Sequence, residues 1–266
     1  MASTDADILS RLDDLALTAG RAIMEVYARG ATVEHKADDS PVTEADRRAE
    51  EIILEGLRSQ WPDVPCVAEE EVSSGRIPPT LGSEFFLVDP LDGTKEFIAR
   101  RGDFTVNIAL IRDGAPAIGV VYAPAQGKIF SGRPGLATEA AVDSDHRAGE
   151  RREINARYSG ANRRIVASRS HRTAETDEFI AKHPGAEIVS VGSSLKFCLL
   201  ARGEADLYPR FGRTMEWDTA AGDAVLRAAG GSTVNIGGTP FVYGKREQAQ
   251  DVDFANPWFI AEAAKN

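Results

Sequence analysis

The sequence predicts a mixed α+β protein, and three observations favour this fold class. The first half carries two helical patterns followed by β-rich runs around a hairpin signal. The second half alternates between strand-like and helix-like segments, which is α/β in character. Residues 137–160 are polar and rich in charge. We therefore predict a lobe boundary there, with an α+β N-terminal lobe over residues 1–150 and an α/β C-terminal lobe over residues 151–266.

Two helices are expected at the start of the chain. Apolar side chains recur at helical spacing over residues 5–29, and Gly30 is suited to cap the C-terminus of this helix. A second helix should begin at Thr43 and end near Trp61. The polar segment between them, at residues 36–41, is typical of a loop.

Strands follow, and then strands alternate with helices. A short apolar strand over residues 85–88 should end at Asp89-Pro90. Two β-rich runs around Asp113-Gly114 should form a hairpin. The expected segments are strands at residues 105–111, 117–122, 164–167, 187–191 and 205–208, with helices between the later ones, including 195–201 and 219–229.

Composition is that of an ordinary globular protein. Of 266 residues, 42% are hydrophobic and 27% are charged, and no run approaches the roughly 20 apolar residues of a membrane span. The N-terminus carries Asp5 and Asp7 and has no basic region followed by an apolar one. We therefore expect a cytoplasmic protein, with loose attachment to the inner face of a membrane left open. Cys66 and Cys198 stand far apart among apolar neighbours, which favours buried thiols.

The net charge limits the class of partner. A formal charge of −10 argues against nonspecific nucleic-acid binding. An acidic enzyme can still act on phosphates if its carboxylates hold cations, and the acidic motifs of the chain are therefore of most interest.

The strongest chemical signal is Asp89-Pro-Leu-Asp92-Gly-Thr94, directly after an apolar strand. The strand should deliver Asp89 to a sheet edge, and the turn should bring Asp92 back toward it, with Gly93 allowing close backbone approach. Two carboxylates about 4 Å apart repel by roughly 4 kcal/mol at an effective dielectric of about 20, so they need a cation between them. Oxygen ligands favour Mg²⁺, Mn²⁺ or Ca²⁺ over zinc. The segment also fits a plain Asp-Pro turn followed by a helix cap.

Two further acidic clusters support a metal site. Glu69-Glu-Glu71 follows the apolar residues 66–68, again at an expected strand end. Trp217-Asp218-Thr-Ala-Ala-Gly222 opens a helix of small residues. Each also has a plain interpretation, since an acidic triplet is usually a solvated turn and Asp218 would serve as a helix N-cap.

Taken together, these motifs resemble the signature of the inositol monophosphatase superfamily. The matching set is Asp46, Glu69-Glu70, Asp89 to Thr94 and Trp217 to Gly222, four spaced motifs in order over nearly the whole chain. The resemblance implies a lithium-sensitive, Mg²⁺-dependent phosphatase. It also implies the layered α-β-α-β-α sandwich of inositol monophosphatase and fructose-1,6-bisphosphatase, with the site in the cleft between the lobes.

The resemblance implies two to three Mg²⁺ ions per site, with Mn²⁺ as a substitute and with Li⁺ and Ca²⁺ as inhibitors. The implied ligands are Glu69, Asp89 and the Leu91 carbonyl for one ion, Asp89, Asp92 and Asp218 for a second, and Glu69 through water for a third. Thr94 and Asp46 would orient and activate the attacking water, with Glu69 in the same catalytic set. Two such ions clamp the attacking and leaving oxygens and lower the pKa of a bound water.

Asp46 has two competing interpretations. Thr43-Glu-Ala-Asp46 fits the spacing of a capping box, in which the third helical residue bonds back to the N-cap amide. The box prefers Glu or Gln at that position, so Asp fits the structural role less well. Mainly on the resemblance, we favour a catalytic Asp46.

The residues outside the metal motifs indicate a branch of the superfamily. After Thr94 comes Lys95-Glu96-Phe97, where inositol phosphatases commonly have Thr-Asn-Phe. The segments most similar to the bacterial CysQ-type 3′(2′),5′-bisphosphate nucleotidases are residues 88–98, 168–171, 192–198 and 207–210.

A bisphosphate substrate needs donors away from the metals. The candidates are Ser168, His171, Ser193, Lys196 and Arg210, while Glu69, Leu91, Asp92, Gly93, Thr94 and Asp218 would bind the substrate at the metal end. Each donor also has a plain role open to it: His171 at the surface, Lys196 on an exposed helix face, Arg210 in an ion pair with Glu204 or Asp206. Tyr208 would stack on a base or lie in the core.

The implied reaction is hydrolysis of the small-molecule nucleotide 3′-phosphoadenosine 5′-phosphate to AMP and phosphate, with its sulfated analogue as a second substrate, in support of sulfate assimilation. One alternative is an inositol-1-phosphate or fructose-1,6-bisphosphate phosphatase, against which Lys95-Glu96 and residues 192–198 argue. Another is a catalytically silent nucleotide-binding regulatory protein, against which the complete set of carboxylates argues.

Overall fold

The computed structural model describes residues 3–36, 39–158, 163–168 and 173–264. Its helices are α1 (Asp5–Arg29), α2 (Glu44–Gln60), α3 (Glu69–Ser73), α4 (Thr94–Ile98), α5 (Ala174–Ala181), α6 (Leu195–Ala201) and α7 (Glu216–Ala228), with a 3₁₀ turn at Pro124–Gln126. Within this described part of the chain, no helix combines the length and apolar composition needed to cross a membrane.

The larger sheet is built from the first half of the chain. Its strands are β3 (Cys66–Ala68), β4 (Glu84–Asp92), β5 (Thr105–Arg112), β6 (Ala115–Ala123), β7 (Lys128–Arg133), β8 (Leu136–Ala141) and β9 (Arg152–Glu153), paired in that order. β3 and β4 are parallel, and the other neighbours are antiparallel. The predicted hairpin through Asp113-Gly114 is confirmed as β5 and β6.

The smaller sheet is built from the second half. Its strands are β10 (Arg164–Ser168), β11 (Glu187–Val191), β12 (Leu207–Arg210), β13 (Ser232–Asn235) and β14 (Phe259–Glu262), in the order β11-β10-β12-β14-β13. The first three are parallel, as the predicted strand–helix alternation requires, and β14 is antiparallel to both its neighbours. A separate antiparallel pair, β1 (Val33–His35) and β2 (Pro41–Thr43), precedes α2.

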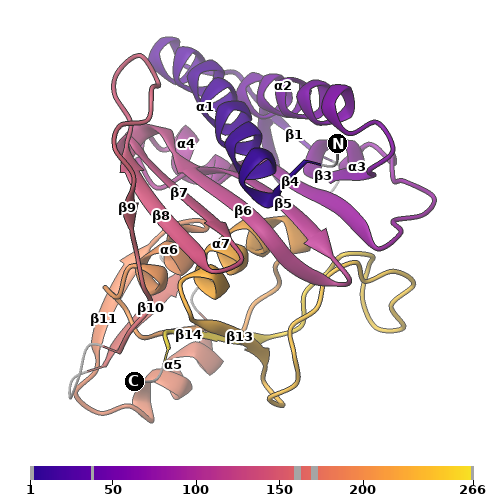
Figure 1. The fold of residues 1–266 in the computed structure, drawn as a ribbon. Helices are drawn as coiled ribbons and strands as arrows, with labels where there is room; N and C mark the ends of the chain where they lie inside the picture. The colour runs from indigo at the N-terminus through magenta and orange to yellow at the C-terminus, as the bar shows by residue number, and fades with distance from the viewer. Residues whose placement is uncertain (1–2, 37–38, 159–162, 169–172, 265–266) are drawn as a thin grey trace.

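These elements stack in five layers (Figure 1). α1 and α2 cover one face of the seven-stranded sheet, and α6 and α7 lie between that sheet and the five-stranded one, with α5 on the outer side of the smaller sheet. The predicted α-β-α-β-α sandwich is confirmed.

The outer helices form where the sequence predicts them. α1 buries Leu12, Ile23 and Val26 at helical spacing and ends at Gly30, whose φ of 85° suits glycine. α2 begins after Thr43, whose hydroxyl accepts a hydrogen bond from Ala45 N (3.1 Å).

The two halves of the sequence share an apolar core. One cluster lies between the seven-stranded sheet and the layer of α1 and α2. The other joins Phe85 and Leu87 of β4 to Phe197, Leu226 and Phe259 from the second half. The two halves of the chain are therefore packed on each other through α6 and α7.

Two glycines let α7 lie close to the larger sheet. A Cβ atom on Gly119 of β6 would stand 2.5 Å from the carbonyl oxygen of Ala221, and one on Gly132 of β7 would stand 2.7 Å from Cα of Val225. Because backbone atoms of α7 occupy that space, larger residues at either position would displace the helix.

Three predicted boundaries are wrong. The strand expected at residues 205–208 is β12 (Leu207–Arg210), which lies two residues later. β4 does not end at Asp89-Pro90 but continues to Asp92, with a shift of its pairing register between Asp89 and Asp92. Such a bulge accommodates Pro90, which has no N–H to donate. α7 begins at Glu216 rather than Thr219, so Asp218 is not an N-cap. It is the third helical residue, and its Oδ2 accepts from Met215 N at 2.8 Å.

Several short strands were not predicted. β1, β2, β7, β13 and β14 are missing from the sequence interpretation, and β8 and β9 occupy part of the polar segment 137–160. The seven-stranded sheet ends at Glu153 and the five-stranded sheet starts at Arg164. Cys66 and Cys198 are buried free thiols, as predicted.

Candidate active site

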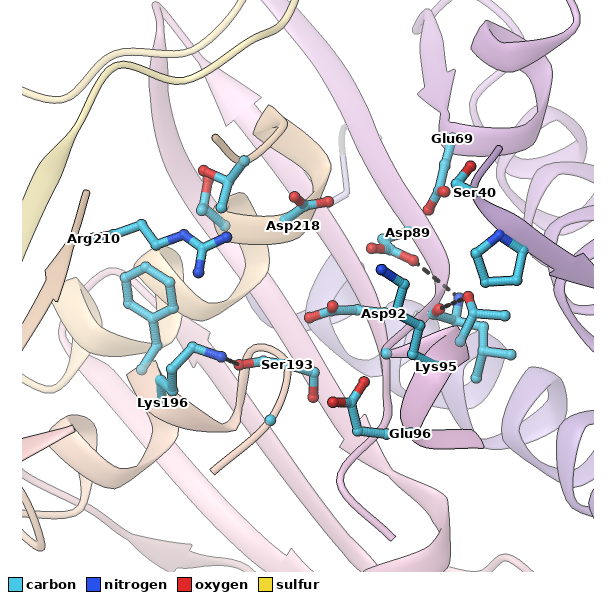
Figure 2. A pocket seen from close by; sticks show the side chains of 18 of the residues that line it. Ser40, Glu69, Asp89, Asp92, Lys95, Glu96, Ser193, Lys196, Arg210 and Asp218 are labelled. Carbon is cyan, nitrogen blue, oxygen red and sulfur yellow. Dashed lines mark hydrogen bonds between the residues drawn. The ribbon is translucent and has the colours of Figure 1, made fainter. Parts of the chain in front are cut away.

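A cavity of about 300 Å³ lies where the end of β4 faces α6, β12 and the start of α7 (Figure 2). Its lining includes most of the residues singled out in the sequence: Glu69, Asp89, Leu91, Asp92, Gly93, Thr94, Ser193, Lys196, Arg210 and Asp218. Residues far apart in the chain therefore meet at one site.

The turn after β4 shapes the acidic side of the cavity. Asp89 is buried, and its Oδ1 accepts a hydrogen bond from Leu91 N (3.0 Å), which fixes the turn. Gly93 has a φ of 95°, and a Cβ there would stand 3.0 Å from the Asp103 carbonyl oxygen. Glycine is needed at this position for both reasons.

Burial makes negative charge costly in this cavity. It is the largest cause that raises the pKa of Asp89 well above its ordinary value, and the carboxylates of Glu69, Asp92 and Asp218 raise it further. Burial likewise raises the pKa of Asp92 to about 6 and that of Asp218 to about 8. Binding of protons or cations therefore stabilises this cluster relative to the unneutralised carboxylates.

The donor set fits a hard divalent cation, since four carboxylate residues, Glu69, Asp89, Asp92 and Asp218, line one cavity. Figure 2 shows Glu69, Asp89, Asp92 and Asp218 with carboxylates turned into the same space. In the described residues, however, no three acidic, histidine or cysteine side chains converge closely enough to hold one ion. Binding an ion between them requires these carboxylates to move closer together.

Lys36 provides a cation beside this cluster. Its Nζ lies 2.6 Å from Oε1 of Glu69 and 2.6 Å from Oε1 of Glu70. The Glu69 carboxylate is therefore held by an internal ion pair, and an ion that binds Glu69 competes with this ammonium group.

Asp46 lies behind the cavity wall, and its carboxylate bonds both to the start of α2 and to a residue that lines the cavity. Its Oδ2 accepts from the N–H (2.8 Å) and hydroxyl (2.7 Å) of Thr43, which caps α2. Its Oδ1 accepts from the Thr94 hydroxyl (3.0 Å), which lines the cavity. Burial, above all other causes, raises the pKa of Asp46 to about 6.

The opposite wall is cationic. Lys196 is 6% exposed, its Nζ donates to the Ser193 carbonyl (2.5 Å) and stands 5.4 Å from the centre of the Tyr208 ring. Burial lowers the pKa of Lys196 to about 8. Arg210 is 8% exposed and donates to the Arg213 carbonyl (3.0 Å), while its Nε has no hydrogen-bond partner among the described residues.

These contacts decide some of the plain interpretations. In the part of the chain that the structure describes, no ion pair joins Arg210 to Glu204, which pairs with Arg202, or to Asp206, which accepts from Arg164 N. Tyr208 lies in the core, edge-on to Phe197 and Phe259, and also lines the cavity.

Three candidate substrate residues are not shown as hydrogen-bond donors to the cavity. The Ser193 hydroxyl donates its proton to the Asp103 carbonyl (3.2 Å), so toward a phosphate it offers lone pairs and no proton. Ser168 ends β10, and its side chain lies outside what the structure describes. His171 lies outside the described residues.

Sequence reasoning missed polar residues that support the site. Asn107 of β5 donates to Ser194 Oγ (3.0 Å) and to Asp92 Oδ2 (3.4 Å), and so links the two walls. Glu50 of α2 is buried and accepts from Glu70 N (2.7 Å) at the start of α3, which has no side-chain cap of its own. Neither lies in a motif, and their roles depend on contacts between distant segments.

Comparison with known proteins gives consistent matches. Residues 6–264 match the model of the inositol monophosphatase family. The 3′(2′),5′-bisphosphate nucleotidase CysQ of Escherichia coli strain K12 is 45% identical over 254 residues, covering 95% of this chain and 98% of that protein. CysQ of Buchnera aphidicola is 39% identical, covering 96% and 94%.

Solved structures of the same family also match this chain. CysQ from Bacteroides thetaiotaomicron, described as a bacterial member of the inositol monophosphatase family, matches with a TM-score of 0.78 and 37% identity, over 97% of this chain and 98% of that one. An inositol monophosphatase from Thermotoga maritima matches with a TM-score of 0.75 at 24% identity, over 96% and 92%, and shows the shared fold.

Proposed function

Because the chain belongs to the inositol monophosphatase family, we propose that it is a Mg²⁺-dependent phosphomonoesterase that hydrolyses 3′-phosphoadenosine 5′-phosphate to AMP and phosphate. Relatives named 3′(2′),5′-bisphosphate nucleotidase, 45% identical over nearly the full length, support this substrate class. The sulfated analogue has the same 3′-phosphate and carries its sulfate on the 5′-phosphate. Removing the by-product 3′-phosphoadenosine 5′-phosphate would support sulfate assimilation.

One observation carries the choice of a bisphosphate. The cavity has an acidic wall, suited to metal ions and the scissile phosphate, and a second wall with Lys196 and Arg210, while Lys95 and Glu96 also line the cavity. Metal chemistry does not require the second wall, and a phosphate of the substrate would neutralise it. Charge-assisted hydrogen bonds to phosphate are among the strongest that a protein makes.

We propose that Glu69, Asp89, the Leu91 carbonyl, Asp92 and Asp218 hold two to three Mg²⁺ ions, that Mn²⁺ can replace them, and that Li⁺ and Ca²⁺ inhibit. When bound, Mg²⁺ would neutralise phosphate charge and lower the pKa of a coordinated water. Thr94 and Asp46 then act as a relay: the Thr94 hydroxyl gives its proton to Asp46 Oδ1, so its lone pairs are free to accept a proton from the attacking water.

The experiment compares two substrates on one variant, with and without Mg²⁺. In Lys196→Ala, KM for 3′-phosphoadenosine 5′-phosphate should rise roughly 10-fold to 100-fold, because a charge-assisted bond is lost. KM for 3′-AMP, which has no 5′-phosphate, should barely change. Lys128→Ala, an exposed lysine on β7 outside the cavity, is the matched control and should change neither.

Two results would contradict the assignment. An equal loss on both substrates would show that Lys196 does not bind the second phosphate. A wild-type preference for inositol-1-phosphate would reject the nucleotide and leave a phosphatase of another substrate.

A further inference from the structure

Asp103 holds the turn that carries Ser193 and Lys196, although it lies outside the cavity. It stands in the loop between α4 and β5, in the first half of the chain. Its Oδ2 accepts from Gly192 N (3.3 Å), and its carbonyl oxygen accepts from the Ser193 hydroxyl (3.2 Å). One residue therefore holds two consecutive residues of the turn between β11 and α6.

The contact between Asp103 and Gly192 is close, and Gln126 holds Asp103 from its other side. A Cβ on Gly192 would stand 2.8 Å from the Asp103 carbonyl oxygen and 2.9 Å from Asp103 Cβ, so only glycine fits here. On the other side, Gln126 Nε2 donates to Asp103 Oδ1 (3.2 Å) and to the Gly102 carbonyl (3.3 Å). The carboxylate is thus fixed through both of its oxygens.

The held turn has an unusual backbone. Ser193 adopts a φ of 41°, a left-handed conformation that a non-glycine residue keeps only when its surroundings enforce it. The Ser193 carbonyl accepts from Lys196 Nζ at 2.5 Å, the dashed contact in Figure 2. The orientation of this carbonyl therefore decides where the Lys196 ammonium group lies in the cavity.

We propose that Asp103 is a positioning residue for substrate specificity: by fixing the Gly192–Ser193 turn, it places Lys196 to bind the second phosphate of the substrate. This role rests on the proposed function. None of these hydrogen bonds reaches the acidic wall or the Thr94–Asp46 pair, in contrast to those of Asn107, which contacts both Asp92 and Ser194. The Asp103 carbonyl also lies against Gly93, and a substitution of the side chain leaves that backbone contact in place.

The test is Asp103→Ala, assayed in saturating Mg²⁺ with 3′-phosphoadenosine 5′-phosphate and with 3′-AMP. KM for the bisphosphate should rise roughly tenfold, since misplacing a charged donor weakens its bond to the phosphate. The kcat for both substrates and KM for 3′-AMP should stay within about twofold of wild type. If Asp103 only stabilised the fold, its loss would change the kinetic constants for both substrates alike.

Asp103→Asn is the conservative control and should restore a nearly wild-type KM. Its amide oxygen still accepts from Gly192 N, and its Nδ2 can donate to the side-chain oxygen of a rotated Gln126. Gln126→Ala leaves Asp103 in place and should raise KM for the bisphosphate by about threefold, which gives a readout even if Asp103→Ala folds poorly.

The outcomes separate this role from the proposed function. If the wild-type enzyme has the same KM for the bisphosphate and for 3′-AMP, both the proposed function and the role of Asp103 are overturned. A wild-type preference for the bisphosphate that survives unchanged in Asp103→Ala and Gln126→Ala, or a loss that is equal on both substrates, overturns only the role of Asp103.

Discussion

Asp46 contacts the start of α2 and a residue of the cavity wall with different oxygens of one carboxylate. Oδ2 takes two donors from Thr43, and Oδ1 takes the Thr94 hydroxyl. The two roles that the sequence presents as alternatives are therefore compatible, and they can be separated by substitution.

In Asp46→Asn, kcat should fall by at least about 100-fold with little change in KM, because the amide cannot take a proton from Thr94. Stability should fall by less than about 1 kcal/mol, because the amide oxygen still accepts from Thr43 N–H. Kinetics and urea denaturation on the same preparation give both quantities.

Thr43→Ala provides the matched control. It removes the hydroxyl bonded to Asp46 Oδ2 and should cost about 0.5–2 kcal/mol of stability while sparing kcat. If Asp46→Asn behaved in the same way, Asp46 would be a helix cap and no more.

Asp89 is the buried centre of the carboxylate cluster, and its removal should separate stability from activity. Asp89→Asn keeps the shape of the side chain and removes one charge that Glu69, Asp92 and Asp218 repel. In metal-free buffer at neutral pH the variant should have a melting temperature equal to or above that of wild type. In saturating Mg²⁺ it should retain no more than about 1% of wild-type activity, because an essential ligand is lost. Substantial residual activity would exclude Asp89 as a shared ligand.

At the scale of single elements, α7 is the helix whose position matters most for the site. It carries Asp218, and its start is held by Asn256, whose Nδ2 lies 2.7 Å from the Met215 carbonyl and 3.0 Å from the Thr219 hydroxyl. Its contact with the larger sheet depends on Gly119 and Gly132.

Gly119→Ala should therefore destabilise the protein by about 1–3 kcal/mol, because the added methyl group meets backbone atoms of α7. Activity should fall as well, since the helix that carries Asp218 is displaced. Gly237→Ala is the control, because a Cβ there meets no atom within 4 Å, and it should change the melting temperature little. Equal melting temperatures for the two variants would show that α7 can shift without cost.

The sequence predicts those elements whose signals are local. α1 and α2 match to within a residue because their apolar spacing and caps are complete in the chain itself. The end of β4 was mispredicted because Pro90 normally ends a strand, and only the pairing with β5 shows the bulge. β13 and β14 are four residues each, and the smaller sheet that they complete draws on strands far away in sequence.

The same distinction applies to the site. The residues of the acidic wall could be predicted because they stand in compact motifs. Asp103 could not, because its partner Gly192 is 89 residues away and neither residue type signals the contact. Lys36, which pairs with Glu69 across 33 residues, was missed for the same reason.

At the scale of the whole molecule, the buried carboxylates make stability depend on pH and metal. The pKa of Asp92 is raised to about 6 and that of Asp218 to about 8, so the folded metal-free protein binds more protons than the unfolded chain above about pH 4. Stability should therefore fall as pH rises from about 4 to about 8. Burial lowers the pKa of Lys196 to about 8, so above about pH 8 the unfolded chain binds the extra proton. This lysine therefore makes stability rise with pH only above that range.

Melting temperatures in a chelator should accordingly be lower near pH 8 than near pH 5, by several degrees, at about 2–4 °C per kcal/mol for a chain of this size. Saturating Mg²⁺ should raise the melting temperature more near pH 8, where the carboxylates are charged and the ion does not compete with protons. A flat profile in the chelator would mean that the carboxylates titrate normally in the folded protein.

The sharing of one core by both halves also has a consequence for synthesis on the ribosome. The seven-stranded sheet is complete once Glu153 has emerged, and α1 and α2 already cover one of its faces. Its other face, with Phe85 and Leu87, is not fully covered until both α6 and α7 have been made, and α7 begins more than sixty residues later. The nascent chain therefore passes through a stage with a wide apolar surface open to chaperones and to other nascent chains, and a product terminated at Glu153 should be insoluble rather than a smaller folded protein.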